Sequence, residues 1–214
     1  MTPAEQSAAA AKICALAPVV PVLIVENTAD AKPLASALVA GGLPALEVTL
    51  RTPAALDVIR AMAEVEGGVV GAGTLLTPAD VKAAKAAGAK FGVSPGATQA
   101  LIDACAEYEL PLLPGAATAS EVMFLLEQGF TVQKFFPAEY AGGVPLLSAW
   151  SSPLPQVKFC PTGGVSPSNA VKYLSLPNVI CVGGSWVAPK SAVASGNWAE
   201  ITRLAADARL IAGV

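Results

Sequence analysis

Short apolar segments alternate with longer segments rich in alanine and leucine along almost the whole chain. The apolar segments are typical of buried β-strands, and the longer segments are typical of helices. Successive predicted strands begin about 20 to 26 residues apart, which is the length of one strand-plus-helix unit. The eight predicted strands are Val19–Val25, Ala45–Leu50, Val69–Gly73, Phe91–Ser94, Leu112–Pro114, Thr131–Phe136, Lys158–Cys160 and Val179–Val182.

A predicted helix follows each strand, and glycines stand where several of these helices should end. One more helix is predicted at the N-terminus, because Thr2-Pro3-Ala4-Glu5 combines a capping box with a proline at the first helical position. The helices predicted after the strands are Ala29–Ala40, Pro53–Ala63, Pro78–Ala87, Thr98–Tyr108, Ser120–Gln128, Val144–Trp150, Pro167–Leu174 and Trp198–Ile211.

Strict alternation of eight strands with helices indicates an α/β fold whose parallel strands close into a (β/α)₈ barrel. We expect residues 1–214 to form one such barrel domain, with the N-terminal helix in front of it, because no linker or low-complexity tract interrupts the pattern. The alternative is an open doubly wound sheet. That fold usually has fewer strands and a glycine-rich first turn, which this chain lacks.

The composition limits the partners. Hydrophobic residues make up 54% of the chain and charged residues 14%. Much of the surface must therefore be weakly charged or covered, which favours an oligomer. The net charge of −3 and the lack of a basic cluster argue against nucleic acid or an anionic membrane as a partner. No segment resembles a signal peptide or a membrane span, so we expect a cytoplasmic protein.

The residue types that are present limit the chemistry. The chain has no histidine, which argues against a transition-metal site or a histidine-dependent triad. The cysteines Cys14, Cys105, Cys160 and Cys181 are scattered, with no Cys-x-x-Cys motif, and we interpret them as small core residues. We expect no metal and no cofactor. Catalysis would then depend on Lys, Glu, Arg, Thr, Ser and backbone amides.

Lys134 lies inside the apolar segment 130–137, where a charged ammonium group is costly to bury. Burial favours the neutral amine, which attacks carbonyl groups and forms Schiff bases. The alternative is a lysine whose long side chain reaches the surface from a strand end. Strand alternation puts Lys134 on one face with Val132 and Phe136, and puts Gln133 and Phe135 on the other.

Glu47, Thr49 and Arg51 share one face of the second predicted strand, opposite an apolar face. On an edge strand such a face would be solvated. A closed parallel barrel has no such face, so these side chains should point into the barrel or its mouth. Glu47 could then lie across the barrel from Lys134 as a proton shuttle, and Arg51 could grip a carboxylate through two hydrogen bonds. Thr74 would add a hydroxyl at the rim, although an N-cap of the next helix is an alternative role.

Two glycine-rich turns follow the last two predicted strands, and they contain Gly163-Gly164 and Gly183-Gly184-Ser185. Loops at these positions of a barrel commonly bind phosphate through backbone N–H groups. A single Gly-Gly pair usually marks only a turn. Two such pairs after consecutive late strands indicate a phosphorylated substrate.

These motifs resemble those of the 2-keto-3-deoxy-6-phosphogluconate (KDPG) aldolases, a family that includes members cleaving 4-hydroxy-2-oxoglutarate (KHG). The resemblance runs from about Val19 to Trp186. The segments that carry it are Leu46–Thr52, Gly71–Thr74, Ser94–Gly96, Leu113–Gly115, Lys134–Glu139, Phe159–Gly164 and Gly183–Trp186.

The resemblance implies a metal-independent aldolase that forms a Schiff base, usually as a homotrimer of barrels. It implies cleavage of KDPG to pyruvate and glyceraldehyde 3-phosphate, and of KHG to pyruvate and glyoxylate. Lys134 matches the Schiff-base lysine and Glu47 the general acid/base. The matched substrate-binding residues are Arg51, Thr74, Pro95, Phe135 and Thr162, and the matched phosphate-binding residues are Gly163, Gly164, Gly184 and Ser185.

Three other functions stay open at this point. The same chemistry could act mainly on 2-keto-3-deoxy-6-phosphogalactonate. A phosphosugar isomerase or epimerase barrel would share the late phosphate loops but would give Lys134 no covalent role. A non-catalytic barrel could use the same polar interior only to hold a ligand.

Overall fold

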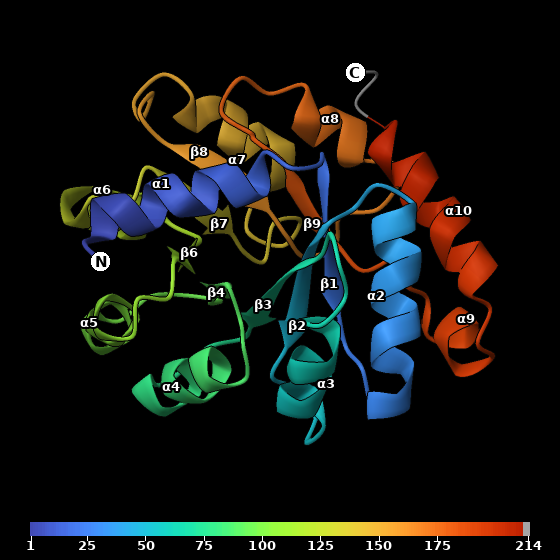
Figure 1. Ribbon diagram of the computed structural model, residues 1–214. Coiled ribbons are helices and arrows are strands. Elements are labelled where there is room, and N and C mark those ends of the chain that lie inside the picture. The colour runs from blue at the N-terminus through green and yellow to red at the C-terminus, as the bar shows by residue number, and fades with distance from the viewer. Residues whose placement is uncertain (212–214) are drawn as a thin grey trace.

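The computed structural model describes residues 1–211 and consists of a ring of parallel strands surrounded by helices (Figure 1). One sheet has the strand order β5-β4-β3-β2-β1-β9, and the other has the order β6-β7-β8. The strands are β1 (Val19–Leu23), β2 (Ala45–Thr49), β3 (Val69–Gly73), β4 (Phe91–Val93), β5 (Leu112–Leu113), β6 (Gly115–Ala116), β7 (Val132–Phe135), β8 (Lys158–Pro161) and β9 (Val182–Gly184).

The two sheets join into one closed barrel. β5 and β6 are consecutive parts of one barrel strand, separated at Pro114, which has no N–H group to donate to a neighbouring strand. On the other side, the parallel bridges Phe159↔Val179 and Thr162↔Gly183 connect β8 with β9. The predicted eight-stranded barrel is therefore confirmed, and the open doubly wound alternative is wrong.

Helices cover the outside of this ring (Figure 1). The short helix α9 was not predicted, and η1 overlaps the start of the helix predicted at Ala29–Ala40. The helices are α1 (Pro3–Cys14), η1 (Thr28–Asp30), α2 (Ala31–Ala40), α3 (Ala55–Met62), α4 (Pro78–Ala86), α5 (Gln99–Glu107), α6 (Ala119–Gln128), α7 (Gly143–Trp150), α8 (Ala170–Leu174), α9 (Lys190–Ala194) and α10 (Trp198–Arg209).

The last barrel strand lies later in the chain than predicted. The sequence placed it at Val179–Val182 and assigned the glycines after it to a turn, whereas β9 includes both Gly183 and Gly184 and pairs with β1. Glycine is needed inside the barrel at this position. A Cβ atom on Gly183 would lie only 2.2 Å from Oγ1 of Thr162.

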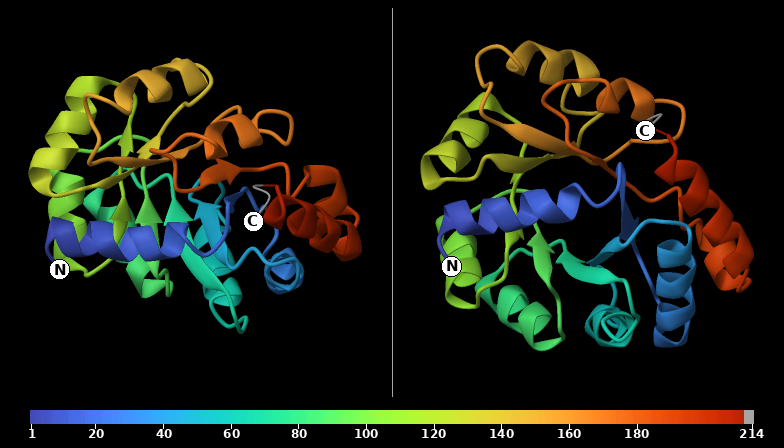
Figure 2. Two further views of the ribbon diagram at one scale, coloured as in Figure 1. Left: turned by 90° about the horizontal axis from the view of Figure 1, so that it is seen from above. Right: turned by 45° about the horizontal axis from the view of Figure 1, so that its top comes forward.

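α1 crosses the end of the barrel where the strands begin (Figure 2). The predicted capping box of Thr2 and Glu5 is present at its start. Ala10 and Cys14 pack into the barrel interior, and the Ser7 hydroxyl accepts hydrogen bonds from the N–H groups of Thr131 and Val132 at 2.9 and 3.0 Å. The helix thus closes this end, so that side chains in the interior are reached from the opposite end.

The core has an inner and an outer part, as strand alternation requires. The inner cluster fills the barrel, and the larger outer cluster lies between the strands and the helices. All four cysteines are buried free thiols, as predicted, and burial raises the pKa of Cys105 to about 12. The Cys105 thiol therefore stays protonated near neutral pH.

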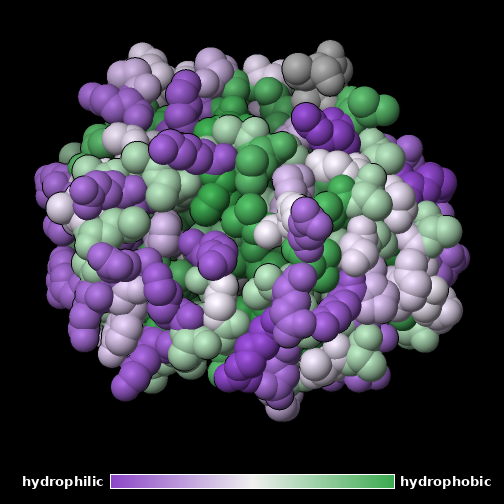
Figure 3. All heavy atoms as spheres, in the orientation of Figure 1, coloured by the Kyte–Doolittle hydropathy of each residue, from purple (hydrophilic) through white to green (hydrophobic). Residues whose placement is uncertain are grey.

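The face that α1 crosses exposes hydrophobic residues near its centre. Figure 3 shows hydrophobic residues gathered there, with hydrophilic residues around the edge. Among residues 1–211, none of the helices has the length and apolar character needed to cross a membrane.

Candidate active site

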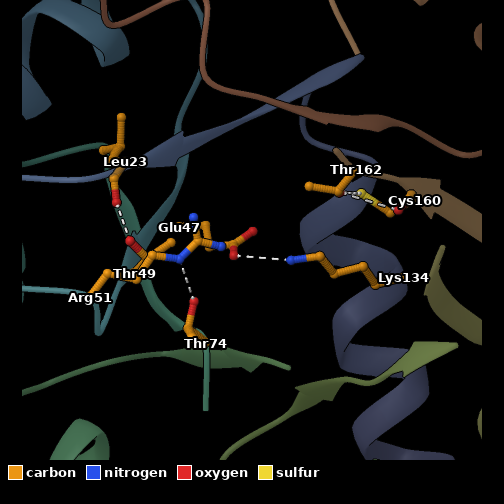
Figure 4. Close-up of polar contacts among 8 residues, drawn as sticks. All are labelled: Leu23, Glu47, Thr49, Arg51, Thr74, Lys134, Cys160 and Thr162. Atoms are coloured by element: carbon orange, nitrogen blue, oxygen red, sulfur yellow. Dashed lines mark hydrogen bonds and ion pairs between the residues drawn. The ribbon is translucent and has the colours of Figure 1, made fainter. Parts of the chain in front are cut away.

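Lys134 and Glu47 form an ion pair inside the barrel (Figure 4). Lys134 comes from β7 and Glu47 from β2, and Nζ lies 3.3 Å from Oε1. Each residue is only 3% exposed, so the alternative in which the lysine reaches the surface is wrong. The other ion pairs found within residues 1–211 have partly or largely exposed partners.

Gly73 makes room for the carboxylate of this pair. A Cβ atom at position 73 would lie 2.3 Å from Oε1 of Glu47, closer than any side-chain carbon can approach. β2 and β3 are paired in register, with Thr49 opposite Gly73. The glycine in the motif Gly71-Ala72-Gly73-Thr74 therefore has a specific use, which is to let the Glu47 side chain bend toward Lys134.

Arg51 and Thr74 meet at the rim, where the strands end (Figure 4). Nε of Arg51 donates a hydrogen bond to Oγ1 of Thr74 at 3.2 Å. Thr74 has a φ of 62°, a left-handed backbone conformation that is strained for a β-branched residue. The alternative role of Thr74 as a helix N-cap is wrong, since Thr77 caps α4.

Thr49 shares the inward face of β2 but has a different task. Its hydroxyl donates a hydrogen bond to the carbonyl oxygen of Leu23 at 2.9 Å, and the residue is fully buried. The bond ties the ends of β1 and β2 together. Of the three polar residues on this face, Glu47 is the one that the structure pairs with Lys134.

A cavity of about 140 Å³ opens at the same end of the barrel. Neither Lys134 nor Glu47 lines it, but its wall includes Phe136, whose ring centroid lies 5.1 Å from Nζ of Lys134. Its lining includes Arg51, the Gly163-Gly164 turn after β8, and the end of β9 with Ser185. Its lining residues are Val22, Ile24, Arg51, Phe136, Thr162, Gly163, Gly164, Val165, Gly183, Gly184 and Ser185.

The glycine turns present free hydrogen-bond donors at this cavity. Within residues 1–211, the N–H groups of Gly163, Gly164 and Ser185 donate no hydrogen bond to the protein. Gly163 and Gly164 have φ values of 99° and 80°, a conformation that other residues rarely adopt. Consecutive N–H groups in such a conformation form a concave site for an anion.

One predicted substrate contact is wrong. The Phe135 side chain lies on the outer face of β7, where its ring centroid is 5.6 Å from that of Trp150. Phe136 lines the cavity instead, with its ring centroid 5.1 Å from Nζ of Lys134. Strand alternation already put Phe136 on the face of Lys134, so this signal could have identified the correct phenylalanine.

Thr162 and Pro95 differ in their placement. Thr162 is buried, lines the cavity and has Oγ1 within 3.9 Å of Sγ of Cys160. Pro95 follows β4 and packs its carbonyl group against Gly115 of β6, where a Cβ atom would lie 2.3 Å away. The structure does not bring Pro95 into the lining of the cavity.

Comparison with known proteins gives consistent matches. The family model for KDPG and KHG aldolase matches residues 10–204. The KHG/KDPG aldolase of Escherichia coli K12 is 50% identical over 200 residues, which cover 93% of this chain and 94% of that protein.

Two crystal structures are also similar. The KDPG aldolase of Zymomonas mobilis ZM4, solved with 3-phosphoglycerate, has a TM-score of 0.89 and 51% identity, and 94% of each chain is covered. The KDPG aldolase of Legionella pneumophila, with pyruvate captured at low pH as a covalent carbinolamine intermediate, has a TM-score of 0.90 and 47% identity. That match covers 93% of this chain and 97% of the Legionella chain. The chain belongs to the KDPG and KHG aldolase family.

Proposed function

We propose that the protein is a class I aldolase that cleaves KDPG reversibly to pyruvate and glyceraldehyde 3-phosphate and also cleaves KHG. The observation that carries the proposal is the buried Lys134–Glu47 pair beside a cavity lined by Arg51 and two glycine turns. A Schiff-base aldolase for a phosphorylated keto acid requires four groups. These are an amine, a proton acceptor, a cation that binds the carboxylate, and a loop that binds the phosphate. The carbinolamine captured in the Legionella relative agrees with this chemistry.

Lys134 is the proposed nucleophile. Its neutral amine attacks the C2 ketone carbon of the sugar acid, and a proton passes to the resulting alkoxide. Loss of water from the carbinolamine then gives a protonated imine, which withdraws electrons from the bond between C3 and C4. Oε1 of Glu47 lies 3.3 Å from Nζ of Lys134. Glu47 accepts a proton from the Lys134 ammonium group, which leaves the neutral amine.

Glu47 is also the proposed base for bond cleavage. It removes the C4 hydroxyl proton, through a water where the distance requires one. The C3–C4 bond breaks as its electron pair moves toward the imine nitrogen. Glyceraldehyde 3-phosphate departs, and the protonated Glu47 returns its proton to C3 of the remaining enamine. Hydrolysis of the imine then releases pyruvate and restores the lysine, so every proton and electron pair is accounted for.

The two ends of the substrate bind at opposite sides of this centre. Arg51 and Thr74 bind the C1 carboxylate, since a guanidinium group matches a planar carboxylate. Thr162 contacts the substrate near C2 from the cavity wall. The phosphate binds to backbone N–H groups and one hydroxyl. These come from Gly163, Gly164, Gly184 and Ser185.

Borohydride trapping with pyruvate, followed by peptide mass spectrometry, tests the proposal most directly. A reduced pyruvate adduct on Lys134 is expected. No adduct in protein shown to be folded by circular dichroism would contradict the aldolase assignment and favour an isomerase or a binding protein. An adduct on another lysine would contradict the role of Lys134 alone.

The protein assembles as a homotrimer in this proposal, and its expected location is the cytoplasm. A largely apolar groove of about 460 Å³ between α6 and α7 supports an interface between copies, because Met123, Leu126, Trp150 and Leu154 line it. Met123 is 52% exposed, an unusual position for a large apolar side chain without a partner. Analytical ultracentrifugation of Met123→Glu should show dissociation, whereas Lys82→Glu on α4 should leave the assembly intact.

A further inference from the structure

We propose that Glu139, held in place by Tyr173, is a positioning residue for the phosphate subsite. It fixes the backbone amides of Gly163 and Gly164 from the side opposite the cavity. The inference rests on the proposed function, because it concerns how that subsite is built. The residues involved come from the segment after β7, the turn after β8, and α8.

The carbonyl groups of the glycine turn are all held from one side. The N–H groups of Ala138 and Glu139 donate to the carbonyl oxygens of Thr162 and Gly163 at 2.8 and 3.1 Å. The side-chain amide of Asn169 donates to the carbonyl oxygen of Gly164 at 3.1 Å. Because three consecutive carbonyl groups are engaged in this way, the N–H groups of Gly163 and Gly164 remain available to the cavity.

The Glu139 side chain supports the same turn by direct contact. A Cβ atom on Gly164 would lie 2.6 Å from Cγ of Glu139, so the two residues are packed as closely as glycine allows. A pocket of about 480 Å³ lies on this side of the turn, lined by Glu139, Gly143, Asn169 and neighbouring residues. Glu139 does not line the cavity on the other side. The turn therefore forms a wall, with the carboxylate behind it.

Tyr173 determines where the carboxylate points. Its hydroxyl donates a hydrogen bond to Oε1 of Glu139, while its ring is fully buried in the core. Burial, together with the neighbouring carboxylate, raises the pKa of Tyr173, so that the hydroxyl stays protonated as a donor. A carboxylate turned toward the cavity would repel a phosphate dianion. The hydrogen bond instead keeps it near Gly143, at the start of α7.

Three variants separate this role from a general structural one. Tyr173→Phe removes the hydroxyl and keeps the ring, Glu139→Ala removes the support, and Glu139→Gln keeps an acceptor for Tyr173. We expect Tyr173→Phe and Glu139→Ala to raise KM for KDPG by about tenfold, as the loss of one hydrogen bond to a charged group implies. KM for KHG should stay unchanged, because KHG has no phosphate. The kcat for both substrates and the rate of pyruvate methyl-proton exchange should also stay unchanged. Glu139→Gln should stay near the wild type.

Inorganic phosphate, used as a competitor of KDPG cleavage, distinguishes the two proposals. If phosphate does not inhibit the wild type, the phosphate subsite itself is wrong, and the inference falls with it. If phosphate inhibits the wild type and both Tyr173→Phe and Glu139→Ala with equal inhibition constants, only the inference is overturned. Equal rises in KM for KDPG and KHG would also overturn it. A weaker inhibition by phosphate, confined to these two variants, would support it.

Discussion

Nζ of Lys134 and Oε1 of Glu47 lie 3.3 Å apart inside the barrel, although 87 residues separate them along the chain. Both side chains are 4% exposed, so neither charge has water as an alternative partner. Removing one member of such a pair leaves an unpaired buried charge, which costs about 3–5 kcal/mol. The pair is therefore expected to affect both stability and catalysis, and the two effects can be measured separately.

Replacement of the lysine should abolish turnover and destabilise the protein. Lys134→Met removes the amine and leaves Glu47 unpaired, so we expect no KDPG cleavage and a loss of about 3–5 kcal/mol in the free energy of unfolding. The double variant Lys134→Met/Glu47→Gln should recover much of this stability and none of the activity. Urea denaturation and a coupled aldolase assay measure the two quantities. A double variant no more stable than Lys134→Met would contradict the pairing argument.

Replacement of the glutamate should slow proton transfer without preventing imine formation. Glu47→Gln keeps the size of the side chain but removes the base, and the loss of a general acid/base typically slows turnover by ~10²–10⁴. Exchange of the pyruvate methyl protons, followed by NMR, reports this step directly. Glu26→Gln is a matched control, because Glu26 pairs with Lys190 at the surface. Unchanged exchange in Glu47→Gln would show that another group is the base.

Relief of the strain at Thr74 should separate stability from activity. Thr74→Gly adopts the φ of 62° without strain, which should stabilise the protein by about 1 kcal/mol. It also removes the hydroxyl that holds Arg51, so KM for pyruvate should rise in the condensation reaction. Glu109→Gly is the control, since Glu109 has a φ of 50° in a surface turn away from the cavity. It should gain stability with unchanged kinetics. A Thr74→Gly variant with unchanged KM would remove Thr74 from the site.

The hydroxyl of Ser185 should matter only to the phosphorylated substrate. Ser185 is exposed and lines the cavity beside Gly184. Ser185→Ala removes one hydrogen bond to a charged group, so we expect KM for KDPG to rise by about tenfold while KM for KHG stays unchanged. Steady-state kinetics with both substrates measure this difference. Equal effects on the two substrates would count against a phosphate contact.

The N-terminus of α6 should lose stability in acid. The Glu121 carboxylate accepts hydrogen bonds from the N–H groups of Ala117 and Thr118, and the bond from Ala117 is the main cause that lowers the pKa of Glu121. A carboxyl group whose pKa is lower in the folded state stabilises the protein above its unfolded pKa. This contribution disappears as the pH falls through the folded pKa.

The variant Glu121→Gln tests this pH dependence. At pH 7 the wild type should exceed the variant by about 0.5 kcal/mol in the free energy of unfolding, because glutamine keeps the hydrogen-bond acceptor and loses only the negative charge at the helix N-terminus. The difference should shrink as the pH falls below about 4. Urea denaturation between pH 7 and pH 3 measures it. A difference that does not change with pH would contradict the argument.

Strand alternation predicted the placement of several side chains correctly. It put Glu47 and Arg51 on the face that points into the barrel or its mouth, and it put Lys134 on the same face as Phe136, because side chains in a strand alternate whatever the strand packs against. It also put Phe135 outward, in agreement with the structure. The family motif nevertheless led to the prediction of Phe135 as a substrate contact, since a motif does not distinguish which of two adjacent aromatic rings faces the ligand.

Glycines were harder to interpret from the sequence. Gly183 was taken to belong to a turn, but it lies in β9, and Gly73 looked like an ordinary strand residue. Each glycine is required by a side chain from a neighbouring strand, Thr162 in one case and Glu47 in the other. Such a requirement depends on which strands become neighbours, and local sequence does not contain that information.

The sequence by itself determined the number and order of the strands, the face on which each polar side chain lies, and the family to which the chain belongs. Periodicity and residue type are local properties, so they can be read before the chain folds. The tertiary structure decided which of these side chains meet. Closure of the ring set the 3.3 Å between Lys134 and Glu47, and the packing of α8 placed Tyr173 against Glu139 behind the glycine turn. These contacts join residues far apart in the chain, and barrel closure and helix packing determine their distances.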